Sequence, residues 1–258
     1  MTRRGRLTLG LAVGVPAATV ALLAAQVYYA ATVDRPDLEP TYEMRARVEV
    51  PGDARALRLV VIGDSLAAGT GAPTVAGALP TQIAERVAAE LDRSVAVRGH
   101  AVSGARTADV FDTQVPLIAE SEPDAVVIVV GSNDVTHATP PWTLRSRTDD
   151  LLEATRAAAP GTPIVLAGIP LFGGADRLPL PLRWVVMAYA RPLRSAQAEV
   201  VRETHGVAYV DIAGDASPRF RGVPDAMSAD GYHPSPVGYA FWADAIAPAV
   251  VDAVDPTT

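Results

Sequence analysis

Leu57-Arg58-Leu59-Val60-Val61-Ile62-Gly63-Asp64-Ser65-Leu66 is the stretch that decides the fold. Its first six residues are almost all apolar and rich in branched side chains, which is typical of a strand buried on both faces of a sheet. The apolar run ends at a glycine that is followed by two polar residues. Because ligands bind beyond the carboxyl ends of strands in open parallel sheets, this polar turn predicts a functional site at that edge.

Four further apolar runs have the pattern of buried strands, at 95–97, 125–130, 164–167 and 207–210. Helical patterns fill the gaps: Ile83, Val87 and Leu91 recur at four-residue spacing, and 143–159, 189–205 and 236–250 are further expected helices. Strands that alternate with helices predict a parallel sheet of about five strands with right-handed crossovers and a covering of helices.

Composition limits the class of protein. A chain of 258 residues with 49% hydrophobic content is long enough for one globular domain with an N-terminal appendage. The chain carries −7, and residues 1–33 contribute three arginines and no acid, so the remainder carries −10. Such an acidic body does not suggest a nucleic-acid partner. The absence of cysteine excludes disulfides, thiol catalysis and cysteine-ligated metal sites.

The N-terminal segment predicts a membrane anchor. Arg3, Arg4 and Arg6 precede a stretch, 7–33, that has no charged side chain, and a bilayer core requires about 20 such residues in a helix. A cleaved signal peptide would have a shorter apolar region of roughly 7–15 residues. We therefore favour retention, with secretion after cleavage and a buried core helix as alternatives. The basic end is expected in the cytoplasm and the body outside.

Three regions are therefore expected along the chain. Residues 1–33 form a cytoplasmic tip and a transmembrane signal-anchor. Residues 34–55, which are rich in charge and proline, form a stalk or linker. Residues 56–258 form the globular domain, which is expected on the extracytoplasmic face of the cell membrane.

Two further motifs follow later strands or lie near the end of the chain. Gly131-Ser132-Asn133-Asp134 follows the 125–130 run and holds the only asparagine, and Asp230-Gly231-Tyr232-His233-Pro234 lies in a loop. Together with Ser65 they supply a nucleophile, a donor for a developing oxyanion, and a base with a carboxylate nearby. Taken singly, each has a structural alternative: Ser65 as a helix N-cap, and Asn133 and the Asp230 loop as turns.

These motifs resemble the SGNH, or GDSL-type, hydrolase family, named for its catalytic Ser, Gly, Asn and His, and the resemblance covers most of residues 57–250. It implies Ser65 as nucleophile and amide donor, His233 as base with Asp230 behind it, and Asn133 as side-chain donor to the oxyanion. It also implies a flavodoxin-like three-layer α/β/α fold with no metal, and the mechanism needs no cofactor.

The resemblance further implies Gly104 as a second amide donor. In this region the chain departs from the family pattern, because Arg98-Gly99-His100-Ala101 stands where many members have an asparagine. Trp142, Leu171 and Trp184 belong to apolar segments that are expected to rim the site and bind substrate. Ordinary connecting loops are the alternative for these segments.

The expected activity is hydrolysis of carboxylic esters through an acyl-enzyme on Ser65, by a membrane-tethered esterase or lipase-like enzyme. The expected substrate is a small-molecule, lipid or glycan ester. One alternative is an O-acyltransferase or acetyl esterase that acts on an extracellular glycan, since the same residues serve when a sugar hydroxyl replaces water. The other is a non-catalytic surface binding module.

Overall fold

The computed structural model describes residues 3–53 and 55–255, with side chains from residue 18 onward. Residues 1 and 2 of the expected cytoplasmic tip, Ala54 of the expected linker, and 256–258 of the expected catalytic domain lie outside the described residues.

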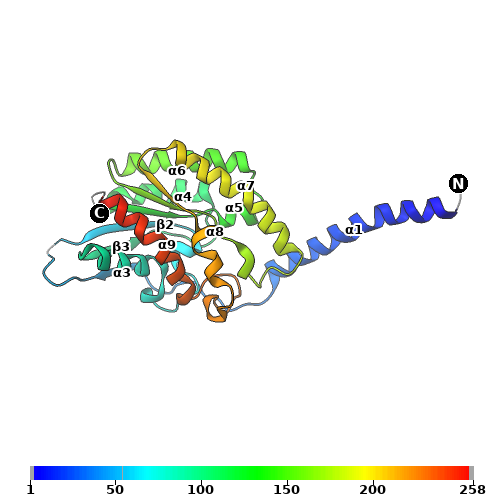
Figure 1. The fold of residues 1–258 in the computed structure, drawn as a ribbon, viewed down its shortest axis with the longest axis horizontal. Coiled ribbons are helices and arrows are strands. Elements are labelled where there is room, and N and C mark those ends of the chain that lie inside the picture. The colour runs from blue at the N-terminus through cyan, green and yellow to red at the C-terminus, as the bar shows by residue number, and fades with distance from the viewer. Residues whose placement is uncertain (1–2, 54, 256–258) are drawn as a thin grey trace.

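A six-stranded sheet forms the centre of the domain, in the order β1-β3-β2-β4-β5-β6 (Figure 1). Strands β2 to β6 are parallel, and their relative order is the doubly wound arrangement of flavodoxin-like folds. The mostly parallel α/β sheet predicted from the apolar runs is therefore confirmed. The strands are β1 (Arg45–Val48), β2 (Leu57–Gly63), β3 (Val95–Gly99), β4 (Ala125–Val129), β5 (Ile164–Ala167) and β6 (Val207–Val210).

Strand β1 was not expected, because it lies within the segment that the sequence assigns to a linker. It pairs antiparallel with β3, from Arg45 opposite Arg98 to Val48 opposite Val95. Its alternating charged and apolar residues suit an edge strand with one face in water. The sheet therefore has six strands instead of about five, and part of residues 34–55 belongs to it.

Helices cover both faces of the sheet (Figure 1). Leu57, Leu59 and Val61 of β2 pack with α3 and α9, whereas Val60 and Ile62 pack with α4, α6 and α7. Successive side chains of a strand point to opposite faces, so this single apolar run belongs to two cores. The long helices of the domain are α3 (Leu79–Leu91), α4 (Thr107–Thr113), α6 (Pro141–Ala158), α7 (Leu182–Glu203) and α9 (Pro236–Val254).

Short helical elements fill the connections. They are α2 (Ser65–Ala68), α5 (Ser132–Thr136) and α8 (Ile212–Asp215), with 3₁₀ turns η1 (Val75–Gly77), η2 (Val115–Leu117), η3 (Ala119–Ser121), η4 (Phe172–Gly174), η5 (Ser217–Phe220) and η6 (Pro224–Ala226). Helices α2 and α5 begin directly beyond the ends of β2 and β4, so both lie at the carboxyl edge of the sheet.

Helix α1 (Arg3–Thr32) extends away from the domain, and its last turns contact it (Figure 1). Gln26 Nε2 donates to the Leu180 carbonyl at 2.6 Å, and Gln26 Oε1 accepts from the Leu182 amide at 3.0 Å. Arg177 Nε donates to the Ala30 carbonyl at 2.8 Å. A polar residue in an apolar helix thus joins α1 to the start of α7.

Among residues 18–53 and 55–255, whose side chains the structure describes, one helix is long and apolar enough to cross a membrane, and that helix is α9. It is a core helix, with 44% of its apolar window buried. The segment Ala18–Thr32 of α1 is a shorter apolar helix. The transmembrane role of the N-terminal segment is therefore not confirmed and stays a prediction.

Candidate active site

Ser65 is the first residue of α2, at the sharp turn that ends β2. Gly63 makes this turn with a φ of +146°, and a Cβ there would lie 1.9 Å from the Val129 carbonyl oxygen, so only glycine fits. The Asp64 amide donates to the same oxygen at 3.0 Å, and Asp64 Oδ1 caps α2 by accepting from the Leu66 amide at 3.0 Å. The turn holds the Ser65 hydroxyl at the carboxyl edge of the sheet.

His233 and Asp230 lie next to Ser65 and form a hydrogen-bonded chain with it. The His233 Nε2 to Ser65 Oγ distance is 2.9 Å, and the His233 Nδ1 to Asp230 Oδ2 distance is 2.6 Å. The Tyr232 and His233 amides donate to Asp230 Oδ1 at 2.8 and 3.0 Å, and Ser228 Oγ donates to it at 2.8 Å. The loop therefore fixes the carboxylate by contacts on both oxygens.

The electrostatics of the pair set the direction of proton transfer. Burial of Asp230 raises the pKa of its carboxyl, but hydrogen bonds from the His233 ring and from the His233 and Tyr232 amides outweigh burial and lower that pKa well below its usual range. The carboxylate is therefore ionised and holds the proton of the imidazole on Nδ1. Nε2 is then the basic nitrogen, and it faces the Ser65 hydroxyl.

Three groups are predicted from the sequence to donate hydrogen bonds to an oxyanion: the amides of Ser65 and Gly104 and the side chain of Asn133. Asn133 Nδ2 already donates to the Ala105 carbonyl at 3.1 Å, which orients the amide group and leaves its second hydrogen. Within the described part of the chain, the Ser65 and Gly104 amides have no protein acceptor. Gly104 lies in a turn with a φ of +81°.

Asp134 ties the Asn133 motif to the loop that carries Gly104. Asp134 Oδ2 accepts from the Thr107 amide at 2.9 Å and from the Thr107 hydroxyl at 2.8 Å, inside the protein. Together with the bond from Asn133 to Ala105, these contacts join the ends of β4 and β3. The position of the Gly104 loop relative to Asn133 is thereby set by side chains of α5.

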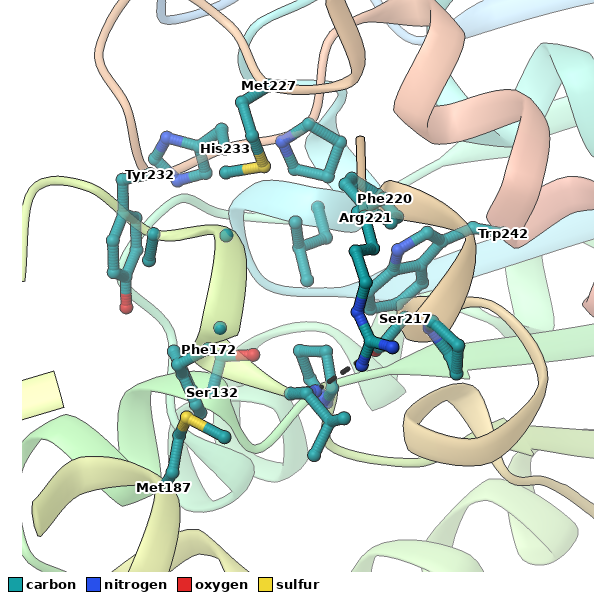
Figure 2. A pocket seen from close by; sticks show the side chains of 18 of the residues that line it. Ser132, Phe172, Met187, Ser217, Phe220, Arg221, Met227, Tyr232, His233 and Trp242 are labelled. Carbon is teal, nitrogen blue, oxygen red and sulfur yellow. Dashed lines mark hydrogen bonds between the residues drawn. The ribbon is translucent and has the colours of Figure 1, made fainter. Parts of the chain in front are cut away.

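A cavity of about 420 Å³ opens beside Ser65 and His233 (Figure 2). Its walls are mostly apolar and come from the connections after β2, β4, β5 and β6, from the loop before α9, and from helices α7 and α9. Lining residues from these walls include Leu66, Asn133, Leu171, Phe172, Met187, Phe220, Met227, Tyr232 and Trp242. Space of this size and character suits the apolar part of a small ester.

The sequence-predicted substrate residues divide between two places. Leu171 lines the cavity, whereas Trp142 and Trp184 are outside its lining and are 75% and 63% exposed. Both tryptophans begin helices, α6 and α7, whose apolar faces point into the core, and the tryptophans themselves lie on the outer sides. Their expected role at the rim of the site therefore stays a prediction. Gly104 also lies outside the cavity lining.

Sequence reasoning missed two buried glutamines that hold the ends of strands. Gln114 accepts from the Gly63 amide at 2.7 Å and donates to the Gly63 carbonyl at 2.8 Å. Gln197 donates to the Val130 carbonyl at 3.0 Å and accepts from the Ile169 amide at 3.2 Å. Each satisfies backbone groups that the sheet leaves free where a strand ends. No local pattern marks these residues, because their partners are far away in the chain.

Asp64 also has a setting that the sequence did not reveal. Complete burial is the main cause that raises the pKa of its carboxyl to about 7, with a smaller contribution from nearby Asp134. Asp64 Oδ2 and Asp134 Oδ1 are both buried without a hydrogen-bond partner in the described structure. Across the same residues, no group of three histidine, aspartate or glutamate side chains is placed to hold a metal ion.

Comparisons with known proteins agree with this geometry. The model of the GDSL-like Lipase/Acylhydrolase family matches residues 61–241. A relative from Mycobacterium tuberculosis, the GDSL-like esterase Rv1075c, is 32% identical over 214 residues, which are 81% of this chain. The match spans 66% of that relative, slightly less than two thirds of its length.

Solved structures share the fold. A lipase/acylhydrolase from Enterococcus faecalis is 22% identical with a TM-score of 0.59, and the match covers 78% of this chain and 99% of that one. LAE5, an alpha/beta hydrolase enzyme from the metagenome of Lake Arreo in Spain, is 19% identical with a TM-score of 0.59, covering 79% and 100% of the two chains. At these identities the likeness concerns the fold alone.

Proposed function

The chain belongs to the GDSL-like lipase/acylhydrolase family, and from that premise we propose that it is a serine-dependent carboxylic ester hydrolase. The observation that carries this proposal is the hydrogen-bonded chain from Asp230 through His233 to Ser65 at the mouth of an apolar cavity. A nucleophile, a base and an orienting carboxylate in this geometry are the requirements of acyl transfer.

In the proposed reaction, His233 Nε2 takes the proton of the Ser65 hydroxyl as Ser65 Oγ attacks the ester carbonyl carbon. The carbonyl oxygen becomes an oxyanion, which accepts hydrogen bonds from the Ser65 and Gly104 amides and from Asn133 Nδ2. His233 then gives its proton to the leaving alcohol as the ester bond breaks. A water molecule, deprotonated by the same nitrogen, then attacks the acyl-enzyme, and His233 returns that proton to Ser65 Oγ as the acid leaves.

Asp230 has a supporting role in this scheme. It stays ionised throughout, and it stabilises the imidazolium that forms when His233 holds two protons. Its own contacts with Ser228 Oγ and two backbone amides keep it from turning away when that charge appears. The apolar lining around Leu66, Phe172 and Trp242 favours esters with an apolar acyl or alcohol part.

We also propose that α1 tethers the enzyme to the cell membrane, with the catalytic domain outside. The charge-free stretch 7–33 after three arginines supports this. The Gln26 bonds to Leu180 and Leu182 join the end of this helix to the domain. In this arrangement residues 1–33 are the anchor, the following segment leads into β1, and the remainder is the hydrolase domain.

The test is turnover of p-nitrophenyl esters of increasing acyl length by the full chain in detergent micelles, with Ser65→Ala as the matched control. We expect release of p-nitrophenol that depends on Ser65, and labelling of Ser65 by an alkyl fluorophosphonate, found by mass spectrometry of the modified peptide. Equal rates for the folded wild-type and Ser65→Ala proteins, with no label on Ser65, would refute ester hydrolysis at this site.

A further inference from the structure

Arg221 is the one side chain with a permanent charge among the described residues that line the cavity. The other lining groups are apolar side chains, glycines, prolines, serines, Asn133 and the two aromatic residues Tyr232 and His233. In Figure 2 the Arg221 side chain lies on the Trp242 side of the cavity, while Tyr232 and His233 lie on the other side. A positive group therefore borders the same cavity as Ser65 and His233.

Nothing in the fold uses the Arg221 guanidinium. In the part of the chain that the structure describes, no ion pair, hydrogen bond or ring contact involves it. Arg219, two residues earlier in the same connection, differs in this respect. Its guanidinium pairs with Asp244 at 2.7 Å and lies 4.4 Å from the centre of the Phe241 ring. Arg219 therefore stabilises the fold through its own contacts, whereas Arg221 borders the cavity.

The charge of Arg221 is opposite in sign to the net charge of the protein. Residues 34–258 carry −10 in total, so the protein as a whole repels anions, and a lone cation at the cavity is the local exception. Arg221 is exposed at the rim of the cavity, so an anionic group that enters from solvent can reach its guanidinium, and the pair is partly screened by water. The planar guanidinium can bind a carboxylate or phosphate through two parallel hydrogen bonds.

We propose that Arg221 binds an anionic group of the substrate, so that the enzyme prefers esters whose acyl or alcohol part carries a carboxylate or a phosphate. This inference rests on the proposed ester hydrolysis and specifies its substrate class. The ester carbonyl lies at Ser65, the apolar middle of the molecule fills the cavity, and the anionic group lies against Arg221. Arg221 is then a specificity-determining residue that does not take part in bond making.

The kinetic test compares neutral and anionic esters of matched size with the full chain in neutral detergent. The acyl arm uses p-nitrophenyl pentanoate and the mono-p-nitrophenyl ester of glutaric acid. The alcohol arm uses aryl acetates with and without a phosphate on the ring. In the arm that matches the natural substrate, Arg221→Gln lowers kcat/KM for the anionic ester about fivefold to tenfold, as expected for one charge-assisted hydrogen-bonded contact. The kcat/KM for the neutral ester changes less than about twofold.

Two control variants separate charge recognition from structure. Arg221→Lys keeps the charge and restores most of the anionic preference. Arg219→Gln removes the same charge from the same connection, but outside the cavity, and leaves the ratio of anionic to neutral kcat/KM unchanged. Added salt lowers the anionic-to-neutral ratio of kcat/KM for the wild type but leaves that ratio unchanged for Arg221→Gln. An anionic-to-neutral ratio that changes less than twofold in both arms for Arg221→Gln overturns the proposal.

A binding measurement keeps the outcome separate from the proposed chemistry. Ser65→Ala and the double variant Ser65→Ala, Arg221→Gln are titrated calorimetrically with the same anionic and neutral esters. Tighter binding of the anionic ester that is lost in the double variant supports the role of Arg221, even if the wild type turns over neither ester. If Ser65→Ala and the double variant bind the anionic ester with equal affinity, the proposed role of Arg221 is overturned, even if hydrolysis is established.

Discussion

His233 Nε2 lies 2.9 Å from Ser65 Oγ although 168 residues separate the two in the chain. The contact joins the turn after β2 to the loop before α9. A second contact makes the junction firm, because the hydroxyl of fully buried Tyr239, in the first turns of α9, donates to the Thr70 carbonyl just beyond α2. The distance between nucleophile and base is thus maintained by the docking of α9 on the central sheet.

Substitution of Asp230 tests the orienting role of the carboxylate. Asp230→Asn keeps the shape of the loop but removes the charge that holds the His233 proton on Nδ1. We expect kcat for a p-nitrophenyl ester to fall by roughly 10²-fold or more, and Ser65→Ala to fall further. Ser228→Ala, which removes one neutral contact to Asp230, is the milder control. Equal and complete losses for Asp230→Asn and Ser65→Ala would contradict this ranking.

Substitution of Asn133 tests the side-chain donor to the oxyanion. Asn133→Ala removes Nδ2, and we expect kcat to fall by roughly 10²–10³-fold with little change in KM, because the interaction develops only in the transition state. Thr107→Val is the matched control, since it removes the Thr107 hydroxyl bond between the Gly104 loop and Asp134 of α5 but leaves all three predicted oxyanion donors in place. A loss in Thr107→Val as large as that in Asn133→Ala would point to loop position instead.

Asp64 predicts a pH dependence of stability. Its pKa is raised to about 7 in the folded protein, so the folded state binds the proton more tightly than the unfolded state. Its contribution to stability is present below about pH 4 and is lost as the pH rises through about 7, with a slope of about 1.4 kcal/mol per pH unit.

The measurement is the free energy of unfolding by urea, from pH 5 to pH 8, for the wild type and Asp64→Asn. Asparagine can still cap α2 through its oxygen but does not titrate. We expect the stability of the wild type relative to Asp64→Asn to decrease across this range. A difference that is independent of pH would show that Asp64 does not titrate in this window.

The hydrogen bonds of Gln26 are expected to slow backbone hydrogen exchange where α1 meets the start of α7. Gln26→Leu removes the acceptor for the Leu182 amide, so we expect faster hydrogen exchange over residues 177–186 in detergent, measured by mass spectrometry, with the core strands unchanged. Gln26→Glu is the matched control, because it retains an acceptor for Leu182 while losing the donor to Leu180. Unchanged exchange in Gln26→Leu would show that α1 does not hold this segment.

Much of the fold could be predicted because its signals are local. The apolar run 57–62 and the four runs after it gave strands whose centres lie where expected, since continuous apolar stretches are what a parallel sheet buries on both faces. Strand β1 was not predicted from the sequence. Its four residues are half polar, and pairing with β3 is what makes them a strand.

Sequence by itself determined the alternation of strands β2 to β6 with helices, the polar turns at the ends of β2 and β4, and the reactive groups of Ser65, Asn133 and His233. Only the tertiary structure decided that Ser65 and His233 are in contact, that Leu171 lines the cavity while Trp142 and Trp184 do not, and that Arg221 faces it without a partner. The reason is physical. Apolar periodicity is a property of residues close together in the sequence, whereas a cavity and its charges arise from segments that meet only when the helices pack on the sheet.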